Sequence, residues 1–177
     1  MTRPTWDDTW IQLCYTLAKR SKDRSTRVGC VIVGPNNIPR ALGYNGIPRH
    51  CNDELEHRHV RPAKYRYFEH AERNAIYNAA REGTRLEGST CYLPGPPCVD
   101  CSRALIQSGI IEVCCDTLLV PDRWKDACDA GLEMLKEANI LVRRPNSREM
   151  IDNWEYVDSS NGYPGWGDAK SRGLSPN

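Results

Sequence analysis

Two short segments of this chain carry side chains that could form one site, but only if each segment lies at the start of a helix. No other feature of the sequence limits the possible folds as much. The two segments are His70-Ala71-Glu72 and Pro97-Cys98-Val99-Asp100-Cys101. Cys98 and Cys101 stand three residues apart, so at a helix start they share a face and can bind one zinc ion. With His70 as a third ligand, the fourth tetrahedral position stays open for water, which is typical of a catalytic zinc site.

Glu72 lies two residues after His70, and in the middle of a helix two such side chains would point apart. The helix must therefore begin at His70 if both are to act together. We then expect Glu72 to take a proton from the zinc-activated water and deliver it to the substrate. A zinc-stabilised interaction module without catalysis is the non-enzyme alternative, and Glu72 argues against it because a closed four-ligand site has no use for this carboxylate.

Composition excludes several classes of protein. The 24 Lys and Arg residues nearly balance the 23 Asp and Glu residues, so no basic field exists to hold a long nucleic acid or a membrane surface. No apolar run could cross a membrane. Nine irregularly spaced cysteines make a poor disulfide framework, so we expect a cytoplasmic protein with free thiols. Six should lie in the core: Cys14, Cys30, Cys91, Cys114, Cys115 and Cys128.

Hydrophobic periodicity predicts an α/β domain whose mixed sheet begins with a hairpin. We expect helices over residues 5–19, 69–82, 98–108 and 126–138, and strands over 28–33, 40–44, 90–93, 110–115 and 140–143. Residues 45–67 read as a long functional loop, and Trp124 as a packing anchor. Residues 1–145 would form the catalytic domain, and residues 146–177 a partly irregular C-terminal extension.

The two segments resemble the zinc-dependent cytidine and deoxycytidylate deaminase family, over a match that runs from Trp6 to Val142. Residues 21–29, 43–48 and 106–110 look like its deoxycytidylate branch. The resemblance implies a three-layer α/β/α fold with a sheet of roughly five strands. It also implies zinc held by His70, Cys98 and Cys101, with Glu72 as the proton shuttle.

The same resemblance implies hydrolytic deamination of dCMP to dUMP and ammonia, a step that supplies dTMP synthesis. Members of this branch are commonly hexamers regulated by dCTP and dTTP, and a triphosphate effector would bring Mg²⁺ with it. The family's effector loop corresponds here to Gly43, Tyr44, Asn45 and Gly46. Asn45 is also a natural partner for a deoxyribose hydroxyl.

Other substrates stay open at this point. Relatives often carry a tyrosine that helps hold the substrate phosphate, where this chain has Thr117, Leu118 and Leu119. Arg24 and Arg27 are the candidate phosphate contacts instead. A deaminase of dCTP or of 5-substituted dCMP remains an alternative. A tRNA adenosine deaminase is a further alternative. The neutral net charge and the 43–46 loop argue against it, because an RNA-binding protein should show a basic patch.

A second group of metal-ligating side chains lies in the long loop. His50, Cys51, His57 and His59 form this group, and some relatives hold an additional structural zinc there. We therefore treat these four residues as a candidate second zinc site.

Overall fold

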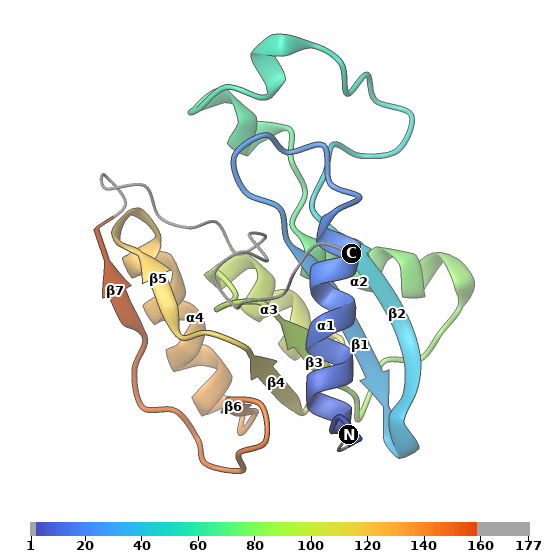
Figure 1. The fold of residues 1–177 in the computed structure, drawn as a ribbon, viewed down its shortest axis with the longest axis vertical. Coiled ribbons are helices and arrows are strands. Elements are labelled where there is room, and N and C mark those ends of the chain that lie inside the picture. The colour runs from blue at the N-terminus through green and yellow to red at the C-terminus, as the bar shows by residue number, and fades with distance from the viewer. Residues whose placement is uncertain (1–2, 159–177) are drawn as a thin grey trace.

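The protein is described from a computed structural model, in which residues 3–158 are described. Its centre is a five-stranded sheet with the strand order β2-β1-β3-β4-β6 (Figure 1). The strands are β1 (Gly29–Gly34), β2 (Ile38–Tyr44), β3 (Thr90–Leu93), β4 (Glu112–Cys115) and β6 (Leu141–Arg143). Four α-helices accompany them: α1 (Trp6–Ala18), α2 (Ala71–Glu82), α3 (Val99–Gln107) and α4 (Lys125–Glu137).

The sheet is mixed, as predicted. Strand β1 pairs antiparallel with both β2 and β3, whereas β3, β4 and β6 run parallel. The predicted hairpin of β1 and β2 is confirmed, with a turn at residues 35–37 where Asn36 and Asn37 have positive φ angles of 62° and 58°. Asparagine tolerates this left-handed geometry better than most residues.

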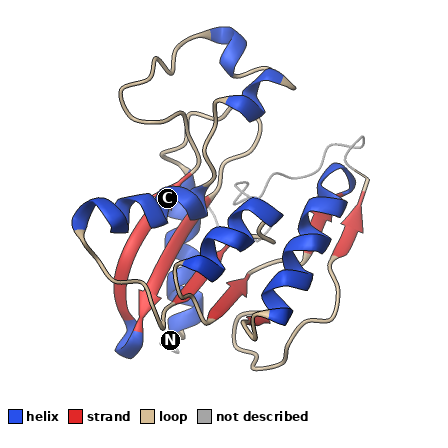
Figure 2. Ribbon diagram, turned by 180° about the vertical axis from the view of Figure 1, so that it is seen from behind, coloured by secondary structure: helices blue, strands red, loops and turns tan. Residues whose placement is uncertain are grey.

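The helices cover both faces of the sheet, which confirms the predicted three-layer α/β/α architecture. Helix α1 lies on one face, and α2, α3 and α4 lie on the other (Figures 1 and 2). Alternate residues of β1 point to opposite layers, since Val31 and Val33 join the cluster under α1 while Cys30 and Ile32 join the cluster under the other helices. All six cysteines predicted to lie in the core are buried.

One edge of the sheet collects the segments that matter for chemistry. Because β1 is antiparallel to its two neighbours, the start of β1 and the ends of β2 and β3 lie at the same edge. Helix α3 begins shortly after β3, and the bridge between Gly46 and Glu69 brings the start of α2 to the end of β2. Ligand sites favour the carboxyl ends of strands in such sheets.

Two short strands were not predicted from the sequence. Strand β5 (Leu119–Pro121) pairs parallel with β7 (Glu155–Val157) in a separate two-stranded sheet. Ile151 and Trp154 are buried, and the Trp154 indole donates a hydrogen bond to the Cys128 carbonyl at 2.9 Å. Residues 146–158 therefore pack on the domain, residues 159–177 lie outside the described part, and the domain division at residue 145 stays a prediction.

Within residues 3–158 no helix is long and apolar enough to span a membrane.

The long loop between β2 and α2 contains two 3₁₀ turns, η2 (Glu56–Arg58) and η3 (Ala63–Arg66). Another 3₁₀ turn, η4 (Asp122–Trp124), leads into α4. The loop and its turns stand above the sheet edge in Figures 1 and 2.

A buried arginine at the end of β6, Arg143, connects this edge strand of the sheet to α1. The Arg143 side chain is only 2% exposed and pairs with Asp7 and Glu112, at 2.6 Å each. Although burial works against the charge of Asp7, hydrogen bonds from Arg143, Asn146 and Tyr92 hold its pKa below the usual range. The stabilisation by Asp7 is thus present above about pH 4 and is lost as the pH falls through the lowered pKa.

We predict that Arg143→Met destabilises the fold by about 3 kcal/mol, because two carboxylates lose their buried partner. Arg144→Met is the matched control: Arg144 pairs with Glu155 at 2.9 Å, but both side chains are about half exposed, so a change within about 0.5 kcal/mol is expected. Urea denaturation at pH 7 measures both. Equal stability of the two variants would contradict the role given to Arg143.

Candidate active site

Three side chains predicted as zinc ligands meet at this edge. The ligating atoms of His70, Cys98 and Cys101 all lie within 4.8 Å of one another. The Nδ1 atom of His70 lies 3.5 Å from the Cys98 sulfur and 3.4 Å from the Cys101 sulfur. Among the residues that the structure describes, this is the one group of three or more His, Cys, Asp or Glu side chains with such spacing.

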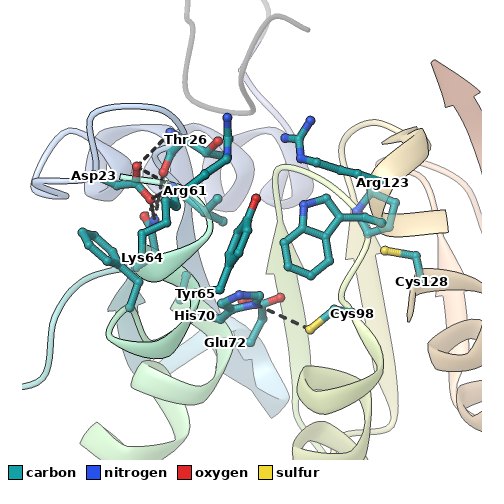
Figure 3. A pocket seen from close by; sticks show the side chains of 16 residues that line it. Asp23, Thr26, Arg61, Lys64, Tyr65, His70, Glu72, Cys98, Arg123 and Cys128 are labelled. Atoms are coloured by element: carbon teal, nitrogen blue, oxygen red, sulfur yellow. Dashed lines mark hydrogen bonds and ion pairs between the residues drawn. The ribbon is translucent and has the colours of Figure 1, made fainter. Parts of the chain in front are cut away.

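The helix starts explain why these side chains converge. His70 is the N-cap residue of α2 and Cys98 is the N-cap residue of α3, both with extended backbone angles. Glu72 therefore lies in the first turn of α2, and both His70 and Glu72 line the same pocket (Figure 3). The helix therefore begins at His70, as it must if His70 and Glu72, two residues apart, are to act at one site.

The first turns also shape the charge of the cluster. Hydrogen bonding with Cys101 lowers the pKa of the Cys98 thiol to about 4 in spite of its burial, and His70 adds to this effect. Burial works against the imidazolium of His70, but the Cys98 hydrogen bond and the charge of Glu72 raise the pKa of this ring to about 8. A thiolate is the form of cysteine that binds metal, and Cys98 is the thiol of the pair that favours it, because the hydrogen bond with Cys98 and burial raise the pKa of Cys101.

Glu72 is a buried carboxyl group beside these donors. Its side chain belongs to a residue that is 5% exposed, and burial raises its pKa above the ordinary value for glutamate. A raised pKa makes a carboxylate a stronger base, which favours its taking up a proton. This is the property that a proton shuttle needs.

An aromatic pair lies over the cluster. The rings of Tyr65 and Trp124 meet edge to face at 5.5 Å between centroids, and Trp124 also contacts the His70 ring at 5.9 Å. Trp124 is half-buried and lines the pocket together with Tyr65 and Phe68. Trp124 packs against the core cluster, as predicted, but its ring also forms part of an apolar pocket wall that could bind a flat ring, which the prediction missed.

The opposite wall is polar and internally bonded. Asn45 accepts a hydrogen bond from the Val28 amide at 2.8 Å and donates to the Thr26 carbonyl at 2.8 Å and to Asp23 at 3.2 Å. Asp23 is in turn paired with the buried Lys64 ammonium at 2.6 Å. Both amide hydrogens of Asn45 are thus in use, and its oxygen can accept one further bond from a ligand.

The predicted phosphate contacts, Arg24 and Arg27, are next to lining residues in the chain but do not themselves line the pocket. Arg24 is exposed and pairs with Glu56 at 2.7 Å. Arg27 is also exposed, and its Nε donates to the Asp23 carbonyl at 3.2 Å. Neither side chain lines the cavity around His70 and Glu72.

The predicted effector loop has a packing function at its first residue. A Cβ atom on Gly43 would lie 2.2 Å from the Ala71 carbonyl oxygen, so β2 can approach the start of α2 this closely only with glycine. Tyr44 is 39% exposed, and Gly46 bridges to Glu69. A role of this segment in effector binding stays a prediction.

The candidate second zinc site is not assembled. His50, Cys51, His57 and His59 do not form a ligand group among residues 3–158. Instead the His59 ring contacts Phe68 at 5.4 Å, and its Nε2 lies 2.7 Å from the Asp53 carbonyl oxygen. His57 contacts Tyr67 at 5.8 Å, and Cys51 is an exposed free thiol.

Comparison with known proteins decides the family. The family model described as the cytidine and deoxycytidylate deaminase zinc-binding region matches residues 4–117. The chain belongs to this deaminase family. The deoxycytidylate deaminase of Homo sapiens is 33% identical over 163 residues, which cover 87% of this chain and 88% of that protein. The probable deoxycytidylate deaminase of Drosophila melanogaster is 37% identical over 151 residues, or 78% and 71% of the two chains.

A solved structure shares the fold of this deaminase. The crystal structure of dCMP deaminase from the cyanophage S-TIM5, in complex with dCMP and dUMP, matches with a TM-score of 0.65 at 24% identity. The match covers 81% of this chain and 99% of that one. The likeness extends across nearly the whole of the phage protein and shows a common architecture.

Membership of a zinc-binding deaminase family agrees with the donor atoms found here. One imidazole nitrogen and two thiol sulfurs fit zinc, and three protein ligands leave a fourth position for a reacting water. The protein is therefore a zinc-dependent deaminase.

Sequence reasoning missed several pocket residues of this deaminase, among them Arg61, Lys64, Tyr65 and Arg123. They lie in 3₁₀ turns or next to one, where no period marks a buried face. The only signal was local: Arg61, Lys64 and Tyr65 immediately precede the His70 segment in the chain.

We predict that the purified deaminase carries about one zinc per chain and that Cys101→Ala weakens zinc binding by on the order of 100-fold or more. Cys115→Ala is the matched control, because Cys115 is a fully buried thiol outside the cluster. Inductively coupled plasma mass spectrometry measures the metal, and circular dichroism checks the fold. Wild-type zinc content in Cys101→Ala would exclude Cys101 as a ligand.

Proposed function

We propose that this enzyme hydrolyses dCMP to dUMP and ammonia. The observation that carries the proposal is the buried Glu72 carboxyl group, which lines one pocket with the donors of an open three-ligand zinc site. The names of the relatives in Homo sapiens and Drosophila melanogaster support dCMP as the substrate. A zinc site without chemistry would have no use for Glu72.

The chemistry divides between the metal and the chain. Zinc, when bound by His70, Cys98 and Cys101, supplies the Lewis acidity that makes water a nucleophile near neutral pH. Glu72 would take one proton from the attacking water and transfer it to the ring nitrogen N3 of cytosine while a bond forms between the water oxygen and C4. Glu72 would then take the second proton from the new C4 hydroxyl and deliver it to the amino nitrogen, so that the bond between C4 and this nitrogen breaks, ammonia leaves and the C4 carbonyl of dUMP forms.

The walls of the pocket suit a cytosine nucleotide. Tyr65 and Trp124 offer ring faces and edges to the flat base and exclude water from the cluster. The second lone pair of the Asn45 oxygen can accept the deoxyribose 3′-hydroxyl, because Val28, Thr26 and Asp23 fix the orientation of this amide. Because the Asn45 amide is already held in this orientation, it could take the place of a water molecule at the sugar hydroxyl without rearranging.

An assay panel tests the substrate. Ammonia release is followed with dCMP, dCTP, 5-methyl-dCMP, cytidine and an adenosine-containing tRNA anticodon stem. We expect the highest kcat/KM with dCMP. If kcat/KM is highest with dCTP or 5-methyl-dCMP, that nucleotide and not dCMP is the substrate. Activity on the tRNA alone would show that the enzyme is a tRNA adenosine deaminase.

We predict that Glu72→Gln retains zinc but lowers kcat for dCMP by on the order of 100- to 10,000-fold, because the amide cannot carry the proton. Glu87→Gln, at an exposed position that pairs with Arg85, is the control and should keep wild-type turnover. Steady-state kinetics and metal analysis of both variants measure the effect. Wild-type kcat in Glu72→Gln would remove the role assigned to this residue.

We further propose regulation by dCTP and dTTP, with Mg²⁺ on the triphosphate, in a homo-oligomer that family resemblance suggests is a hexamer. A groove beside β2 and α2 supports an anionic effector next to the Gly43–Gly46 segment, because Arg40, Arg49 and Arg81 line it. We also infer a cytoplasmic enzyme, since all nine cysteines are free thiols.

If this regulation is present, dCMP kinetics will be sigmoidal, become hyperbolic with dCTP and Mg²⁺, and be inhibited by dTTP. Light scattering at the assay concentration gives the oligomeric state. Hyperbolic kinetics that neither triphosphate changes would remove the regulatory proposal and leave the catalytic one intact.

A further inference from the structure

Two arginines stand at the mouth of the pocket. Arg61 precedes η3 and Arg123 lies in η4, so the chain brings them together from segments about sixty residues apart. Figure 3 shows their side chains reaching from opposite sides toward the opening, above Tyr65 and farther from the floor than His70 and Glu72. Both residues are exposed.

Neither guanidinium has a partner among the residues that the structure describes. The one hydrogen bond given for Arg123 comes from its backbone amide, which donates to Asp122 at 2.8 Å. The third Lys or Arg side chain that lines the pocket is engaged, since the Lys64 ammonium bonds to both Asp23 oxygens at 2.6 and 2.8 Å and to the Ser25 hydroxyl at 2.6 Å. Lys64 therefore balances Asp23 and is not free to bind an anion.

The position of the free cations fits the far end of a nucleotide. A nucleotide whose base reached the floor of the pocket, where Glu72 and the zinc ligands lie, would have its sugar beside Asn45 and its 5′ substituent toward the opening. A phosphate dianion there would meet two planar guanidinium groups, each able to donate two parallel hydrogen bonds.

We propose that Arg61 and Arg123 bind the 5′-phosphate of the substrate and make this enzyme select a nucleoside monophosphate over the nucleoside. The proposal rests on the proposed function and names the residues that determine its substrate class. It replaces Arg24 and Arg27, which lie outside the pocket and carry other contacts. Arg61 and Arg123 would bind the phosphate between them from opposite walls of the pocket mouth, and we call this pair the clamp.

The test compares dCMP with deoxycytidine. In the zinc-loaded wild type kcat/KM should favour dCMP strongly. Arg61→Ala and Arg123→Ala should each lower the ratio of kcat/KM for dCMP to that for deoxycytidine by on the order of 10- to 100-fold, because each removes charge-assisted hydrogen bonds. Arg24→Ala and Arg27→Ala are matched controls on the neighbouring loop and should leave the ratio unchanged.

A binding measurement separates this inference from the proposed reaction. Titration calorimetry with dUMP and deoxyuridine needs no turnover, and the double variant Arg61→Ala/Arg123→Ala should lose the tighter binding of dUMP. A wild type that binds dUMP tightly but deaminates no cytosine nucleotide would overturn the reaction and keep the clamp. A dUMP preference that survives the double variant, is lost in Arg24→Ala or Arg27→Ala, or is absent in the wild type overturns the clamp.

Discussion

The architecture of this protein depends on two helices that begin at one point. The N-cap residues of α2 and α3, His70 and Cys98, bring their donor atoms to within hydrogen-bond distance, and Cys101 follows one turn later. This convergence requires β2 and β3 to end at the same sheet edge, which the antiparallel position of β1 between them provides. The glycine at position 43 then permits β2 to approach α2 closely enough for the edge to close.

The chemistry and the recognition of substrate come from different kinds of structure. Zinc ligands and Glu72 lie on the first turns of helices that are anchored in the core, where position is well determined. The contacts expected for base, sugar and phosphate come from the loops and 3₁₀ turns above the sheet edge. Loops can change without disturbing the helix starts, so one zinc site can serve several substrates within this fold.

Prediction from sequence succeeded where the determining interactions are local. The helix-start positions of His70 and Cys98 follow from spacing within a few residues, and the strand positions of residues such as Val31 follow from alternation of apolar side chains. Strands β5 and β7 escaped because each is three residues long and its partner lies more than thirty residues away. Arg61 and Arg123 escaped because nothing in a loop sequence tells which of its charges will face a cavity.

Strand β7 has a consequence for how much of the chain the enzyme needs. It pairs with β5, which leads directly into the turn that carries Arg123 and Trp124, and the Trp154 indole donates a hydrogen bond to the Cys128 carbonyl of α4. A chain shortened to residue 145 would keep every zinc ligand and Glu72 but lose the brace of one pocket wall. Residues 146–158 therefore support the segment that carries Arg123 and Trp124, so that one wall of the pocket depends on residues that follow all the zinc ligands in the chain.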